Sequence, residues 1–147
     1  MSMAPGTYLK KRREAAGFSV SQVAAALAGM PERIRPLRAK DFELLEEQLL
    51  AVEADDAPLT MPQAALLHRV LHFDLNIYEL LLLRHFCECP TDFPEPQICR
   101  VCACTWNDAC ETERGPCAWM PGDQTLCTAC HDRTAIGGGV ALQGEPV

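Results

Sequence analysis

The sequence predicts a mainly α-helical protein that consists of a five-helix domain followed by a small cysteine-rich module. Two observations support this prediction. Apolar residues recur at helical spacing, between capping and stop signals, over residues 7–86. Seven of the nine cysteines then lie between residues 99 and 130. We therefore expect a helical domain at residues 1–89, a proline-rich linker at 90–98, the cysteine-rich module at 99–133 and a disordered tail at 134–147.

The first two helices are marked by polar caps. Thr7 is expected to cap a helix that ends before Gly17. Ser19 and Gln22, three residues apart, form a capping box that opens a second helix. Residues 30–40 (MPERIRPLRAK) then hold two prolines and four basic residues, which predicts a basic connector in place of a further helix.

Three more helices follow, each opened by a capping signal. Asp41 is expected to cap the third helix, Thr60 with Gln63 the fourth, and Asn76 with Glu79 the fifth. Apolar residues mark each of these helices. Phe42, Leu45, Leu49 and Val52 fall on one face of the third, and Leu66, Leu67, Val70 and Leu71 mark the fourth. The fifth carries Ile77, Leu80, Leu81, Leu82 and Leu83, so its leucines lie on all sides of the helix.

The net charge of −7 is distributed unevenly along the chain. Residues 1–40 carry eight Lys or Arg and two Glu, a net charge of +6, whereas residues 41–60 carry seven acids and no base. A nucleic-acid-binding protein usually has a basic footprint, and only the first forty residues provide one. No apolar run approaches the roughly 20 residues of a membrane span, and the N-terminus lacks the apolar core of a signal peptide, so we expect a cytoplasmic protein without a membrane partner.

Four of the cysteines have the spacing of a metal site. Cys99 and Cys102 form one C-x2-C motif, and Cys127 and Cys130 form another after 24 intervening residues. Two such motifs that face each other can supply four thiolates to one tetrahedral zinc ion, at Zn–S distances of about 2.3 Å. Four protein ligands leave no open position for water, which favours a structural role for the ion. The module also holds few large apolar residues, so it needs such a cross-link in order to fold.

Disulfide bonds and an iron–sulfur cluster are the alternatives to zinc. The odd number of cysteines and the C-x2-C motifs favour a metal over disulfides. Thiolates alone can hold an iron–sulfur cluster, but the paired motifs favour zinc. Cys87 and Cys89 are interpreted as ordinary thiols.

Three further cysteines lie between the two motifs, and a histidine follows the second. Cys104, Cys110, Cys117 and His131 together can form a second zinc site of the Cys3His type. Alternatively, the three cysteines are small buried side chains without a ligand role. The sequence is compatible with both interpretations.

Several segments of the helical domain resemble the lambda-repressor (Xre/Cro) family. Tyr8–Ser19 (YLKKRREAAGFS) resembles its first helix, and Ala24 and Leu27 match positions on its second. Leu50–Thr60 (LAVEADDAPLT) resembles the segment that leads into its fourth helix. His72–Leu81 (HFDLNIYELL) is similar to its closing turn and last helix. The cysteine-rich tail, with Cys99–Cys104 (CRVCAC) and Leu126–Cys130 (LCTAC), resembles one found on small bacterial proteins of prophage type and is expected to form a metal-stapled, zinc-ribbon-like module.

The resemblance implies a helix-turn-helix fold and a DNA-binding transcription regulator of phage or prophage type, with zinc as its cofactor. Contacts are expected with the DNA phosphate backbone, through basic residues and through the start of the second helix. The expected contact residues are Lys10, Arg13, Ser19, Gln22, Arg33, Arg35, Arg38 and Lys40.

The sequence also departs from the family pattern. Val20 stands where the family usually has a glutamine, and the basic connector replaces the tight turn before the recognition helix. The third helix is expected to expose Glu43, Glu46 and Glu47, which is unfavourable in a groove lined by phosphates. The alternative function is a protein-interaction adaptor that uses this acidic helix and the zinc module without binding DNA. The run Leu80–Leu83 is also consistent with a homodimer.

No enzymatic activity is expected. The sequence contains no phosphate-binding loop, dinucleotide fingerprint or paired acidic motif. Cys130, His131 and Asp132 are the residue types of a catalytic triad, but adjacent residues cannot align nucleophile, base and orienting group in space.

Overall fold

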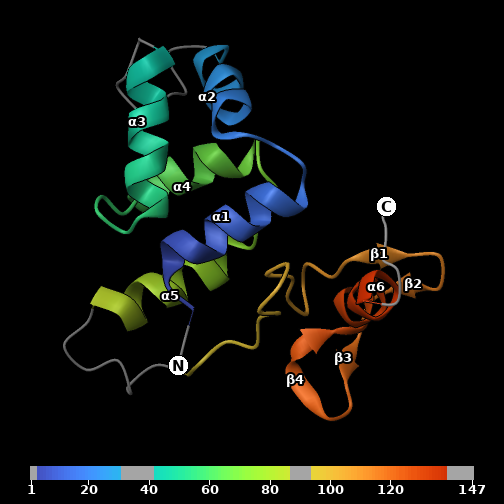
Figure 1. Cartoon of the computed structure of the whole chain (residues 1–147). Coiled ribbons are helices and arrows are strands. Elements are labelled where there is room, and N and C mark those ends of the chain that lie inside the picture. The colour runs from blue at the N-terminus through green and yellow to red at the C-terminus, as the bar shows by residue number, and fades with distance from the viewer. Residues whose placement is uncertain (1–2, 31–41, 87–93, 139–147) are drawn as a thin grey trace. The chain divides into compact units, whose positions relative to one another are not determined.

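The computed structural model describes residues 3–30, 42–86 and 94–138 (Figure 1). The chain divides into two compact units, residues 1–96 and residues 97–147. The described residues form six α-helices and two small antiparallel sheets, so the prediction of a mainly helical chain with a cysteine-rich second part is confirmed at this level. None of the helices in the described ranges has both the length and the apolar composition needed to cross a bilayer.

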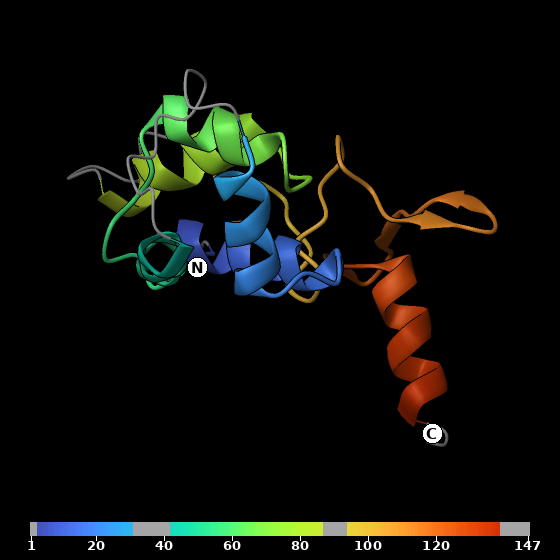
Figure 2. The same ribbon diagram turned by 90° about the horizontal axis from the view of Figure 1, so that it is seen from above.

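The first unit contains five helices that enclose one apolar core. Helix α3 packs against both α2 and α1, and α5 packs against both α1 and α4. Figure 2 shows α4 and α5 together on one side of this unit, with α1, α2 and α3 on the other. The helices are α1 (Pro5–Ala15), α2 (Val20–Ala28), α3 (Phe42–Glu53), α4 (Met61–His68) and α5 (Leu75–Phe86).

The core of this unit holds two buried tyrosines whose hydroxyl groups are both hydrogen-bonded. The Tyr8 hydroxyl accepts a hydrogen bond from the backbone N–H of Asp74 (2.9 Å), and the Tyr78 hydroxyl accepts one from Leu59 (3.2 Å). Both rings contact Phe73 edge to face. A buried hydroxyl group without a partner costs free energy, so each tyrosine retains its hydrogen bond in the folded unit. The two bonds thereby hold the loops before α4 and α5 against the core. The apolar residues expected in α3 are buried at Leu45, Leu49 and Val52, as are Leu66 and Leu67 of α4. Helix α4 ends at His68, so Val70, which is partly buried, and Leu71, which is buried, lie after the helix in which they were expected.

Two of the predicted capping signals are confirmed. The Ser19 hydroxyl accepts a hydrogen bond from the Gln22 N–H (3.1 Å), and the Gln22 side chain accepts one from the Ser19 N–H (2.8 Å). Thr60 and Gln63 form the same reciprocal pair at the start of α4. These capping boxes satisfy backbone donors that would otherwise have no partner at the helix starts.

Two other capping predictions were wrong. Helix α1 begins at Pro5, not after Thr7, and its N-cap residue, Ala4, makes no side-chain cap. Proline suits this place because it has no N–H group to satisfy and its φ angle is already helical. Helix α5 is capped by Asp74, whose carboxylate accepts hydrogen bonds from the backbone of Asn76 (2.9 Å) and Ile77 (3.2 Å). Asp41 and the basic connector lie outside the described residues.

The second unit consists of two short hairpins followed by a helix. Strand β1 (Glu111–Thr112) pairs with β2 (Gly115–Pro116), and β3 (Trp119–Met120) pairs with β4 (Asp123–Cys127). Helix α6 (Thr128–Gly138) follows β4 directly and extends away from the hairpins (Figure 2). Residues 134–138, expected in a disordered tail, therefore belong to this helix.

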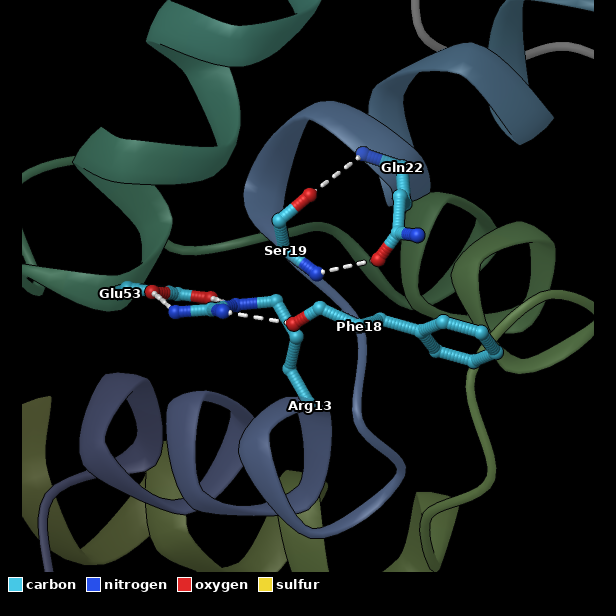
Figure 3. Close-up of polar contacts among 5 residues, drawn as sticks. All are labelled: Arg13, Phe18, Ser19, Gln22 and Glu53. Carbon is cyan, nitrogen blue, oxygen red and sulfur yellow. Dashed lines mark hydrogen bonds and ion pairs between the residues drawn. The ribbon is translucent and has the colours of Figure 1, made fainter.

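An ion pair joins the C-terminal halves of α1 and α3. The guanidinium group of Arg13 donates two hydrogen bonds to the Glu53 carboxylate (2.6 and 2.9 Å) and one to the carbonyl of Phe18 (2.9 Å). Figure 3 shows this guanidinium group between Glu53 and Phe18, next to the Ser19 capping box. The side chains of Arg13 and Glu53 are only 12% and 11% exposed. Such a largely buried, bidentate pair has little competition from water.

The backbones of α1 and α3 also approach each other closely. A β-carbon added at Gly6 would lie 2.5 Å from the carbonyl oxygen of Val52 and would also clash with that of Glu53. The N–H of Gly6 donates to the carboxylate of Asp55 (2.8 Å), which follows α3 and has a φ angle of +63°. Glycine is therefore required at this contact for steric reasons.

We expect Glu53→Ala to destabilise the helical unit by about 3 kcal/mol, because it leaves the Arg13 guanidinium group buried without its counter-charge. Urea unfolding followed by far-UV circular dichroism measures this loss. Glu47→Ala, at an exposed position of the same helix, is the matched control and should change stability by less than about 0.5 kcal/mol. Equal effects of the two substitutions would contradict a structural role for the pair.

Candidate metal centre

A tight loop carries the first three cysteines of the module. The N–H of Ala103 donates to the carbonyl of Cys99 (2.9 Å), and the N–H of Cys99 donates to the carbonyl of Cys104 (3.0 Å). Ala103 has a φ angle of +63°, in the left-handed region, which lets the chain reverse between Cys102 and Cys104. The backbone bonds thus keep these three side chains close to one another.

The remaining cysteines come from the hairpins and the last helix. Cys110 and Cys117 flank the β1–β2 hairpin, and the N–H of Cys117 donates to the carbonyl of Cys110 (2.8 Å). Cys127 is the last residue of β4, and Cys130 lies in the first turn of α6. The segments from residue 99 to residue 130 therefore bring seven thiols into one region of the unit.

The sulfur atoms form two sets of four. The Sγ atoms of Cys99, Cys102, Cys104 and Cys127 all lie within 4.8 Å of one another, and the same is true of Cys104, Cys110, Cys117 and Cys127. Sulfur–sulfur distances in the cluster include 3.5 Å (Cys102 to Cys110), 3.7 Å (Cys104 to Cys117) and 3.9 Å (Cys102 to Cys127). Four thiolates around a tetrahedral zinc ion at about 2.3 Å lie about 3.8 Å apart. The cluster is therefore compatible with a bound metal ion.

This cluster is the core of the second unit. Cys99, Cys102, Cys104, Cys127 and Cys130 are buried, and Cys110, Cys117, Trp119, Leu126 and Ala129 pack against them. Trp106, the other tryptophan of the module, is 83% exposed. The module thus lacks the large apolar core that would stabilise a segment of this size by itself.

The thiols influence each other's protonation strongly. Hydrogen bonds with the thiols of Cys102 and Cys104 lower the pKa of Cys99. Hydrogen bonds with Cys102 and Cys99, together with burial, raise the pKa of Cys104, and burial raises the pKa of Cys127. One thiolate is therefore stabilised at the expense of the others, because like charges repel at short distance in a buried site. A divalent cation would remove this repulsion and allow several thiolates to form together.

Two of the predicted ligands, Cys130 and His131, lie outside both sets of four sulfur atoms. Cys130 is buried, and its sulfur accepts a hydrogen bond from the guanidinium group of Arg133 (3.0 Å). It belongs to neither set of four, whereas Cys104 belongs to both. The His131 side chain is 47% exposed, and its Nδ1 lies 3.5 Å from the carboxylate of Asp132. The position of Cys104 could not be inferred from the C-x2-C spacing, because its role depends on where the loop places it.

A cavity of about 380 Å³ opens beside the sulfur cluster. Trp106 and Trp119 line it, as do three of the clustered cysteines, Cys104, Cys117 and Cys127. The cavity provides a route by which a metal ion could reach the thiols from solvent.

The expected DNA-contact residues have varied surroundings. Lys10 is exposed, whereas Arg13 is occupied by its ion pair with Glu53. Ser19 and Gln22 are exposed and form the capping box of α2. The other four lie outside the described residues and are Arg33, Arg35, Arg38 and Lys40.

Comparisons of the chain with protein-family models, with curated proteins and with solved structures gave no match.

We expect removal of metal by a chelator to unfold the module and leave the helical unit folded, because only the module depends on the sulfur cluster. Trp119 packs against the cluster, so its fluorescence should shift to longer wavelength, most clearly in a Trp106→Phe background. Most of the far-UV circular dichroism of α1–α5 should remain. The Cys87→Ser, Cys89→Ser double variant is the control and should keep its metal. Unchanged emission from metal-free protein would contradict this prediction.

Proposed function

We propose that this chain is a non-catalytic regulator that binds the phosphate backbone of DNA with its helical unit and is stabilised by zinc in its cysteine module. The DNA-binding part rests on the charge of residues 1–40, which carry a net charge of +6. Two of their eight basic side chains have structural roles. Arg13 is paired with Glu53, and Arg12 is buried and donates to the carbonyl of His72 (3.2 Å).

Six basic residues are left for a contact with phosphates. Lys10 is exposed and Lys11 is partly exposed on α1, and the other four belong to the connector at residues 30–40. Helix α2 has no acidic residue in its first turn, but the Glu46 carboxylate of α3 accepts a hydrogen bond from Ser21 there, so the phosphate contact is proposed for the basic side chains. The resemblance to the lambda-repressor family agrees with a contact through this part of the chain.

The acidic residues of α3 argue against insertion of this helix into the major groove. Glu43 and Glu47 are exposed, and Glu46 accepts a hydrogen bond from the Ser21 hydroxyl (2.5 Å). Arginine, not glutamate, makes the most common specific contacts with bases. We therefore propose contacts with the backbone in place of base-specific recognition by α3.

One observation favours a second candidate, a protein-interaction adaptor. Leu44 and Leu50 of α3 are 49% and 56% exposed, close in sequence to the exposed acids Glu43 and Glu47. An apolar and acidic helix face is suited to a basic protein surface more than to DNA. In this candidate function, the helical unit acts through α3 and the connector need not contact a nucleic acid.

A salt series with random duplex DNA separates the two candidates. For the DNA-binding protein, the logarithm of the association constant should fall with the logarithm of the salt concentration, with a slope of about −0.9 for each phosphate neutralised. Substitution of Arg33, Arg35, Arg38 and Lys40 by alanine should make this slope shallower by about 3 to 4. Fluorescence anisotropy of labelled DNA measures both effects.

The matched control removes two exposed basic residues elsewhere, with Arg69→Ala and Arg114→Ala, and should leave the slope almost unchanged. Absence of salt-sensitive binding, or an unaltered slope in the connector variant, would reject DNA binding and favour the adaptor.

The assignment of zinc rests on the chemistry of the ligands. Soft thiolates in sets of four, which leave no open position on a four-coordinate ion, favour a structural zinc ion. We expect elemental analysis of the purified protein to find zinc, and the protein to be colourless. Iron with acid-labile sulfide and visible absorption would instead indicate an iron–sulfur cluster.

A further inference from the structure

We propose that the cysteine module binds two metal ions in a single thiolate-bridged centre, in which the sulfur atoms of Cys104 and Cys127 are shared by both ions. This inference rests on the proposed zinc module and adds the number of ions and the way in which they are connected.

The number of available ligands supports shared sulfur atoms. Two separate tetrahedral ions require eight protein ligands. The region holds seven thiols, and the histidine expected as an eighth ligand, His131, is 47% exposed and faces Asp132. It also belongs to neither four-ligand group found among the described residues. Two ions can therefore both be four-coordinate only if they share at least one thiolate.

The geometry identifies which thiolates are shared. Both sets of four contain Cys104 and Cys127, and each of these residues is only 1% exposed. Cys99 and Cys102 complete one set, whereas Cys110 and Cys117 complete the other. Two tetrahedra with a common edge require six sulfur atoms, which is the number that the two sets contain together.

The charge balance also favours a bridged centre. Six thiolates around two divalent ions leave two net negative charges, whereas seven thiolates and a neutral histidine around two separate ions would leave three. Less uncompensated charge has to be buried in the bridged arrangement. The guanidinium group of Arg133, which donates to the sulfur of Cys130 (3.0 Å), supplies positive charge next to the cluster.

Replacement of the native metal by 113Cd tests the bridge directly in the full chain. Two cadmium resonances with scalar coupling between them are expected, because such coupling passes through a sulfur atom that is bonded to both ions. Native mass spectrometry should find two ions per chain. Two uncoupled resonances would overturn the shared sulfur atoms, and one ion per chain would overturn the binuclear centre while the zinc module stands. No bound metal would reject the zinc module itself.

Single substitutions distinguish shared from terminal ligands. Cys110→Ser should lower the metal content from two ions to about one, because it alters one set only. Cys104→Ser should weaken both ions, with less than one ion retained after dialysis against a weak chelator. Cys87→Ser should retain two. Equal losses in the Cys104 and Cys110 variants would contradict a bridging role for Cys104, and the cadmium coupling of the unaltered chain decides the question if either variant fails to fold.

Discussion

The second unit depends on one constraint, which is that its buried core consists mainly of thiol groups. Thiols are small and pack closely, but they contribute little apolar surface compared with leucine or phenylalanine. Hydrogen bonds among the thiols lower the pKa of Cys99 and raise the pKa of neighbours such as Cys104, so one thiolate is favoured over several. A bound metal ion would change this balance, because it would replace weak sulfur hydrogen bonds with strong coordinate bonds. The free energy of metal binding would then contribute to folding.

The helical unit is stabilised in a different way. Its core consists of aromatic and aliphatic side chains, and its few buried polar groups have partners, as Tyr8 and Tyr78 do. The contact between α1 and α3 combines a close backbone approach at Gly6 with the ion pair between Arg13 and Glu53. A loss of metal should therefore affect one unit and leave the other intact, because the two cores depend on different interactions.

The sequence predicted those features that depend on local spacing. The capping boxes at Ser19 and Thr60 and the buried stripe of α3 follow from residues three or four positions apart, which are neighbours on a helix. The start of α1 was missed because Pro5 begins a helix without a polar cap. The two C-x2-C motifs indicated a metal site because the two cysteines of each motif are only three positions apart. The overlap of two sulfur sets at Cys104 depends on the fold of the whole module, and spacing alone could not reveal it.

The basic residues of α1 show most clearly how burial limits an interpretation of charge. Lys10, Lys11, Arg12 and Arg13 form one basic run in the sequence, and each of them could contribute to a DNA-binding surface. In the folded unit, Arg12 and Arg13 turn towards the protein and bind a carbonyl and a carboxylate. Guanidinium groups are well suited to this role, because they form several hydrogen bonds in a plane and are more weakly hydrated than lysine. Of this run, only the two lysines therefore remain for solvent or a ligand.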